Sequence, residues 1–336
     1  MSSEKPSAKR KAEDAETPLR RLLVSTTLAD VQHGRRRVVS INHNATADDA
    51  LHELAKEHIL SAPVVLAASI EDQESDTYMG IIDISAILKG LFEDVLSKAS
   101  EKAFRWEALK ESAQPFFDRK VITLLGNDVQ LRYRGETTQS LHDLIADGFL
   151  GAGEHEQAHD LAHRIAIFTP TGRINDVISM SDVVLYLSKH KKSLGEKLLQ
   201  TTAEEFGWAD RDVPTVSSKD IVASVVHTMV DKKHAAVAVV DDDCKFRHNF
   251  SNSDLRGLTP KKVPMLLRSV EEFIHAMERK HQHEADITCK PYATFESILD
   301  RLVKQRVHRL YVVGDDKKVK GVVSLTDILR AVVAAA

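Results

Sequence analysis

The chain has 336 residues, 43% of them hydrophobic and 29% charged, which is enough for two ordinary domains with packed cores. Its formal net charge of −4 provides no general attraction to nucleic acid or to membrane surfaces. Two cysteines, Cys244 and Cys289, are too few for a disulfide scaffold. The sequence has no apolar run of about 18 residues and no apolar segment after its N-terminus, so we expect neither a membrane span nor a secretory signal, and a location in the cytoplasm or the nucleus.

Residues 1–20 are predicted to be a disordered tail, because they contain almost no apolar side chains to bury. The basic triplet at residues 9–11 fits a nuclear import signal, although a solvated run of charge is the more frequent explanation of so short a motif.

A first structural unit is expected over residues 28–97. Its elements follow the order strand, helix, strand, and they are expected at 38–41, 50–58 and 62–66. An acidic insertion at 71–76 lengthens the next turn. The unit then closes with a strand and a helix within 80–88.

A second unit is expected over residues 110–190, with its first strand at 121–124. A helix at 140–145 is extended by a glycine-containing stretch, and an apolar strand follows at 163–167. The order of elements is therefore the same as in the first unit.

The third and fourth units are expected over residues 205–258 and 280–336. The third has its strand, helix and second strand at 213–216, 221–229 and 235–240. The fourth has them at 287–289, 295–305 and 308–313. Between these units, an amphipathic stretch at 263–279 is expected to pack between repeats or to face a partner helix. Trp106 and Trp208 fall between units, where we expect them to anchor a core or an interface.

Three near-copies of one motif close the last three units, at 177–184, 249–256 and 322–329. Each copy consists of an apolar strand end, the pattern Ser-x-Ser/Thr-Asp, and an apolar helical run. The aspartates, Asp182, Asp254 and Asp327, lie 72 and 73 residues apart, and such a fixed period indicates a repeated structural unit. The first unit is degenerate, with Asp83 at the serine position and Ala86 at the aspartate position.

The motif suits a phosphorylated ligand, because a helix N-terminus presents unpaired N–H groups and a partial positive charge. In the last copy the hydroxyls of Ser324 and Thr326 are further donors, and Asp327 offers two acceptor oxygens that suit a vicinal diol. The corresponding residues of the other copies are Ser251, Ser253 and Asp254, and Ser179 and Asp182. A helix-capping box, with serine as the cap and aspartate three residues later, explains the same pattern without a ligand, and both explanations can hold together.

A His-Arg pair precedes two of the motifs by the same interval. His163-Arg164 lies 16 residues before Ser179, and His308-Arg309 lies 16 residues before Ser324. The third and first units have Ala235-Ala236 and Leu60-Ser61 at this place. The guanidinium fork of arginine matches phosphate oxygens and histidine adds a donor, so the two pairs are predicted to contact phosphate.

The segment His155–His159 matches the His-Glu-x-x-His pattern of zinc peptidases. It follows a glycine-rich stretch and runs straight into a strand, instead of forming a long buried helix. In a chain with 16 histidines we expect a chance match, at most an adventitious metal-binding row, and no catalytic metal.

The four units, with their Gly-x-x-Ser-x-x-Asp-type endings, resemble cystathionine-β-synthase (CBS) domains. The resemblance implies an α+β fold of four CBS repeats, each β-α-β-β-α, paired head to tail into two Bateman-type modules at 28–190 and 205–336. With one His-Arg pair in each module, we expect each module to have one cationic corner near its centre. The His-Arg pairs and the phrase at 249–258 are similar to the γ regulatory subunits of AMP-activated protein kinase.

That resemblance implies a protein that is not an enzyme and that binds AMP, ADP or ATP, with the ribose held by Asp182, Asp254 and Asp327. It also implies partners, namely a Ser/Thr protein kinase catalytic subunit and a β scaffold subunit. The chain departs from the family pattern, which generally keeps the ribose aspartate in repeat one and loses it in repeat two. A scaffold with decayed, empty clefts is therefore the alternative, and a zinc hydrolase is a distant third.

Overall fold

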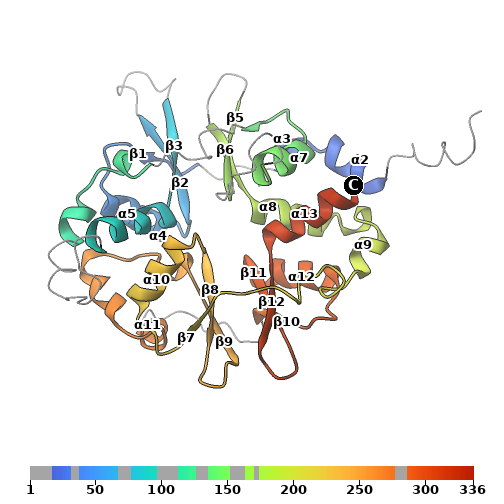
Figure 1. Ribbon diagram of the computed structural model, residues 1–336. Helices are drawn as coiled ribbons and strands as arrows, with labels where there is room; N and C mark the ends of the chain where they lie inside the picture. The colour runs from blue at the N-terminus through green and yellow to red at the C-terminus, as the bar shows by residue number, and fades with distance from the viewer. Residues whose placement is uncertain are drawn as a thin grey trace, which may run out of the picture.

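The computed structural model describes residues 17–31, 38–66, 77–96, 113–125, 135–151, 163–169, 174–276 and 286–336. Within these residues the chain forms four three-stranded sheets of identical topology (Figure 1). In each sheet the first strand pairs parallel with the second, and the second pairs antiparallel with the third. A parallel pair requires a crossover connection, and helical turns provide it in every repeat.

The elements of the N-terminal half are α2 (Pro18–Ser25), α3 (Leu28–Val31), β1 (Ile41–Asn42), α4 (Ala47–Lys56), β2 (Ser61–Leu66), β3 (Thr77–Asp83), α5 (Ile84–Leu96), η1 (Val121–Thr123), β4 (Gly135–Glu136), α7 (Leu141–Asp143), the π-helical η3 (Leu144–Phe149), β5 (Arg164–Phe168), β6 (Ile174–Ser179) and α8 (Met180–Lys189). Those of the C-terminal half are η4 (Lys191–Ser193), α9 (Glu196–Gln200), β7 (Thr215–Ser217), α10 (Val222–Asp231), β8 (Ala236–Val240), β9 (Phe246–Ser251), η5 (Asn252–Leu255), η6 (Pro260–Leu267), α11 (Val270–Ala276), β10 (Thr288–Cys289), α12 (Phe295–Gln305), β11 (Arg309–Val313), β12 (Val319–Ser324) and α13 (Leu325–Ala335).

Helix α12 illustrates how the sequence specifies these elements. The hydroxyl of Thr294 caps its first turn by accepting from the N–H of Ser297, at 3.3 Å. Its apolar residues recur at helical spacing and are buried: Phe295, Ile298, Leu299 and Leu302. The helix ends where Arg306 adopts the left-handed conformation, with φ 53°. Its bounds are those predicted from the sequence.

Two modules arise because the sheets pack in pairs. Repeats one and two meet through the rings of Tyr78 and Phe168, whose centroids are 5.4 Å apart in an edge-to-face contact. Repeats three and four meet through Phe246 and Tyr311, at 4.8 Å, inside a small apolar cluster. The paired arrangement predicted for CBS repeats is therefore the observed one.

The two modules join through their helices, as the two flanking groups of helices in Figure 1 show. One large core combines residues of repeats one and three, and a second combines residues of repeats two and four. Each repeat thus contacts a sheet partner within its module and a helix partner in the other module. The starts of the second strands, which carry the His-Arg pairs, consequently face the middle of the molecule.

Two local predictions in the N-terminal half were wrong. Helix α2 begins at Pro18, with Thr17 as its cap and Leu19 buried, so residues 18–20 are not part of a disordered tail. Residues 121–123 form a 3-10 turn rather than the first strand of repeat two, because Val121 is buried in the core of repeats one and three. The short β4 takes the strand position instead, and its two residues carry no apolar pattern that would reveal it.

The stretch at 263–279 is not one continuous helix. Pro264 has no N–H to donate, and the 3-10 helix η6 gives way to α11 across the extended residue Arg268. Leu266 and Phe273 are nonetheless buried in the core that joins repeats one and three, which confirms the predicted packing between repeats. The tail residues 1–16, the insertion at 71–76, Trp106 and the segment 155–159 lie outside the described residues.

Candidate functional site

The Ser-x-x-Asp motifs of repeats two and four are complete capping boxes. The N–H and hydroxyl of Ser179 donate to Asp182 Oδ2 at 2.8 and 2.6 Å, and the N–H of Asp182 donates back to the Ser179 hydroxyl at 3.3 Å. Ser324 and Asp327 repeat this geometry at the same three distances. The helix-capping interpretation is therefore confirmed for both motifs.

In repeat three the motif does not open an α-helix. The N–H and hydroxyl of Ser251 donate to Asp254 Oδ2 at 2.7 and 2.8 Å, and the hydroxyls of Ser251 and Ser253 lie 2.7 Å apart. Only the 3-10 turn η5 follows, because the chain becomes extended at Arg256 and Gly257 has φ +78°. The predicted apolar helix after Asp254 is therefore wrong, although Asp254 itself is buried.

Repeat one places its carboxylate three residues earlier. Asp83 occupies the cap position, and its Oδ1 accepts from the N–H of Ala86 at 2.7 Å. An acidic cap replaces the serine, and no carboxylate stands at the position of Ala86. The degeneracy predicted from the sequence is therefore a real difference in which group lies at the helix start.

The strand register shows what lies beside each helix start. Arg164 pairs with Ser179, and Arg309 pairs with Ser324. In repeats one and three the paired residues are Ser61 with Asp83, and Ala236 with Ser251. The alternation of absent and present cations inferred from the sequence is thus reproduced by the hydrogen-bonded register.

The two His-Arg pairs meet in one central cluster, which we call the cationic centre: His163, Arg164, His308 and Arg309, together with Arg256 of repeat three. Burial lowers the pKa of His308 to about 4, and the charges of Arg164, Arg309 and Arg256 lower it further. Burial likewise lowers the pKa of His163 to about 4, helped by Arg164 and Arg309. The arginine of each module lowers the pKa of the histidine in the other module. The modules therefore share a single centre instead of having one cationic corner each.

Solvent reaches this centre although protein atoms surround it. His163 and His308 both keep exposed surface, while crowding by protein is the largest cause of their lowered pKa values. Both pKa values are lowered from the ordinary 6.5, so both imidazoles are neutral at pH 7.

Carboxylates from repeats one and two face the same centre. The charges of Asp83 and Asp182 raise the pKa of Arg164, against a larger lowering by burial. Guanidinium groups remain protonated in proteins, so the centre carries several positive charges beside acceptor oxygens. Such an arrangement can bind an anion with the arginines and hydroxyl groups of the same ligand with the carboxylates.

Asp327 has a partner that the sequence did not reveal. While its Oδ2 accepts from Ser324, its Oδ1 accepts from Arg211 Nη1 at 2.7 Å, and only 8% of the Asp327 side chain is exposed. Arg211 lies 116 residues away, in the linker between α9 and β7, the first strand of repeat three, and no motif marks it. The hydroxyl of Thr326 donates to Met180 Sδ of repeat two at 3.6 Å.

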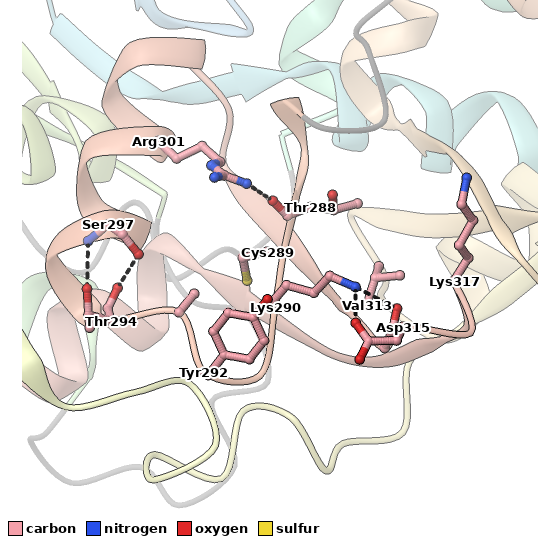
Figure 2. Close-up of a pocket in the computed structure, with 12 residues that line it drawn as sticks. Thr288, Cys289, Lys290, Tyr292, Thr294, Ser297, Arg301, Val313, Asp315 and Lys317 are labelled. Carbon is pink, nitrogen blue, oxygen red and sulfur yellow. Dashed lines mark hydrogen bonds and ion pairs between the residues drawn. The ribbon is translucent and has the colours of Figure 1, made fainter.

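A separate pocket of about 860 Å³ lies at the carboxyl ends of β10 and β11 (Figure 2). Its charged groups engage nearby protein atoms: Lys290 donates to Asp315 at 2.8 Å, and Arg301 donates to the carbonyl of Thr288. Burial raises the pKa of the Cys289 thiol in its wall to about 12, so this cysteine is protonated at neutral pH. The pocket contains none of the residues predicted to bind a ligand.

Among the described residues, no group of three or more histidine, cysteine, aspartate or glutamate side chains is arranged to hold a metal ion. The His-Glu-x-x-His segment lies outside that part of the chain. Within the same ranges, none of the helices has the length and apolarity required to cross a bilayer.

The CBS domain model matches residues 28–93 and 277–334. The 5'-AMP-activated protein kinase subunit gamma of Dictyostelium discoideum is 27% identical over 176 residues, which are 50% of this chain and 30% of that protein. The subunit gamma-3 of Sus scrofa is 27% identical over 184 residues, 51% of this chain and 34% of that protein. The chain therefore spans about a third of the length of these two relatives.

A third relative matches over almost its whole length. It is the SNF1-related protein kinase regulatory subunit gamma-like PV42a of Arabidopsis thaliana, 22% identical over 344 residues, with coverage of 92% of this chain and 95% of that protein. Among solved structures, a candidate archaeal homologue of γ-AMPK from Methanocaldococcus jannaschii superposes with a TM-score of 0.68 at 15% identity, covering 91% of this chain and 99% of that chain. An uncharacterized protein from Pyrococcus horikoshii gives 0.52 at 15% identity, covering 91% of this chain and 100% of that chain. These two structures support the fold.

Proposed function

The chain carries CBS domains and folds as four CBS repeats in two Bateman-type modules, and we propose that it is a non-catalytic regulatory subunit that binds adenine nucleotides at its centre. The observation that carries this proposal is the cationic centre. The arginine of each His-Arg pair lies close enough to lower the pKa of the histidine in the other module, and the helix-start carboxylates Asp83 and Asp182 act on Arg164.

The chemistry of this centre fits a nucleoside phosphate. Arg164 and Arg309 match phosphate oxygens with their planar forks, and the neutral rings of His163 and His308 each provide a donor. The proposed ribose acceptors are Asp182, Asp254 and Asp327, and their motif hydroxyls are further donors: Ser179, Ser251, Ser253, Ser324 and Thr326. AMP, ADP and ATP would compete for these positions, because they share the ribose and the first phosphate.

Regulation follows if the bound states differ in shape. A nucleotide shifts a conformational equilibrium only as far as its affinities for the two states differ. The proposed partners are a Ser/Thr kinase catalytic subunit and a β scaffold subunit. The names of the Dictyostelium and Arabidopsis relatives, a protein kinase subunit and a protein kinase regulatory subunit, support an association with a kinase. Co-expression with such subunits, followed by size-exclusion chromatography, tests this part: a stable complex supports it, and separate elution contradicts it.

Calorimetry tests the nucleotide site. Arg164→Ala and Arg309→Ala should each weaken AMP binding by about tenfold or more, because each removes a charge-assisted contact to phosphate. Arg268→Ala removes the same charge from an exposed position between η6 and α11 and should leave the affinity unchanged. Equal affinities in all four proteins would refute the assignment.

A scaffold with empty clefts is the second candidate. The missing carboxylate at Ala86 and the occupied Asp327 both favour it. Thermal unfolding separates the two, since a ligand that binds the native state at 100 times its Kd adds about 2.7 kcal/mol of stability. An unchanged midpoint at millimolar AMP, ADP and ATP would favour the scaffold.

A further inference from the structure

The linker between α9 and β7 forms a strap across β12. We use "linker strap" for residues 206–211. Trp208 is 3% exposed and stacks on Phe206, with ring centroids 4.1 Å apart, so the strap is anchored in the core of repeats two and four. Its backbone passes so close to Gly321 that a Cβ there would overlap the carbonyl oxygen of Trp208. The N–H of Arg211 then donates to the carbonyl of Lys320 at 3.2 Å.

The linker strap places the guanidinium of Arg211 at the start of α13, the closing helix of repeat four. Arg211 Nη1 lies 2.7 Å from Asp327 Oδ1, with 36% of the arginine side chain and 8% of the aspartate side chain exposed. The other oxygen, Oδ2, accepts from the N–H and the hydroxyl of Ser324. Oδ2 therefore accepts two hydrogen bonds and Oδ1 accepts one, which leaves a single acceptor position on Asp327, whereas the two hydroxyls of a ribose diol need two.

The geometry points to Arg211 as an internal competitor that sets the affinity of the repeat-four site, and this inference rests on the proposed function. A ribose diol can donate both of its hydroxyls to Asp327 only when the guanidinium leaves Oδ1. The apparent Kd is then the intrinsic Kd divided by the fraction of molecules in which the ion pair is open. Because the carboxylate is almost buried, that fraction is small, and removal of Arg211 tightens binding by about tenfold.

Adenosine separates this role from that of a phosphate ligand. If Arg211 competes with the ribose for Asp327 Oδ1, Arg211→Ala tightens the binding of AMP and of adenosine by the same factor. If Arg211 instead contacts phosphate, the same variant weakens AMP and leaves adenosine unchanged, which would overturn the inference. Arg268→Ala is the matched control for the loss of one positive charge at an exposed site.

The titrations are run on the full chain in an Asp182→Asn, Asp254→Asn background, so that the heat reports on Asp327. The expected result is about tenfold tighter binding of both ligands after Arg211→Ala, and loss of that gain when Asp327→Asn is added. Binding that Arg211→Ala does not change overturns this inference alone. A wild-type chain and variants that bind neither ligand overturn the proposed function together with it.

A second measurement checks the ion pair without any ligand. Unfolding by urea is compared for Arg211→Ala, Asp327→Asn and the double variant. The two single changes should be non-additive, because each removes the same contact. Additive effects would show that the contact does not form in solution and would overturn the inference independently of nucleotide binding.

Discussion

Substitution at Gly321 should dislodge the linker strap. A Cβ at this position would overlap the carbonyl oxygen of Trp208, and its next contacts are also backbone atoms of the strap, Trp208 C and Ala209 Cα. Backbone cannot turn aside as a side chain can, so Gly321→Ala must displace the strap. The displaced strap loses the hydrogen bond from the Arg211 N–H, worth about 1 kcal/mol, and part of the burial of Trp208, whose complete loss costs about 3–5 kcal/mol. We expect a total of about 2–3 kcal/mol.

Gly314→Ala provides the matched control, because the added methyl meets only the ends of the flexible side chains of Asp316 and Lys320. It should cost less than about 1 kcal/mol. Urea unfolding followed by tryptophan fluorescence gives both values, and native-state hydrogen exchange at the Arg211 amide reports on the strap directly. Equal destabilisation by the two variants would refute the strap argument.

Three further predictions concern individual side chains. Ser179→Ala should destabilise the fold by about 1 kcal/mol in urea, because it removes a helix cap, and a loss near zero would mean that water replaces the cap. The folded pKa values of His163 and His308 lie near 4, below the ordinary 6.5, so the unfolded chain takes up protons first as the pH falls. The stability that these histidines contribute is therefore complete above pH 6.5 and decreases towards pH 4. The variant with both His163→Gln and His308→Gln should have a flatter slope of unfolding free energy against pH in this range. An unaltered slope contradicts the assignment. Iodoacetamide at pH 7.5 should label the exposed Cys244 and spare Cys289, whose thiol is buried with its pKa raised to about 12, and mass spectrometry would reveal labelling at the wrong residue.

Periodicity predicted the architecture because the same physical units recur. The apolar spacing of 295–305 appears as α12 with identical bounds, and the constant interval from histidine to serine appears as the register of Arg164 with Ser179 and Arg309 with Ser324. In these cases local sequence and tertiary packing favour the same structure. The prediction failed at 121–123, where an apolar run is buried against another repeat and is not a strand.

Contacts between distant segments could not be predicted from the sequence. The sequence placed one cationic corner in each module, and only the packing of the modules brings His308 close to Arg164. The contact of Arg211 with Asp327 depends on the path of a linker that contains no repeat motif. A period reveals what repeats have in common, whereas a contact made once in the molecule leaves no periodic signal.

The cationic centre would couple the proposed nucleotide sites of the two modules electrostatically. Arginines of two modules lie close enough to shift the titration of the same histidines, so they also repel one another when no anion is bound. A phosphate bound to the arginine of one module would reduce that repulsion. It would also make the electrostatic potential at the arginine of the other module less positive. If nucleotides bind in both modules as proposed, each changes the affinity of the other module by the same factor, because coupling between sites is reciprocal. The sign of this coupling depends on two opposing effects. A bound phosphate compensates the charges of the arginines and so favours closer packing of the modules. It also leaves less positive charge to attract a second anion. Because both histidines are neutral at pH 7, the arginines carry this balance alone, and their removal should abolish coupling as well as affinity.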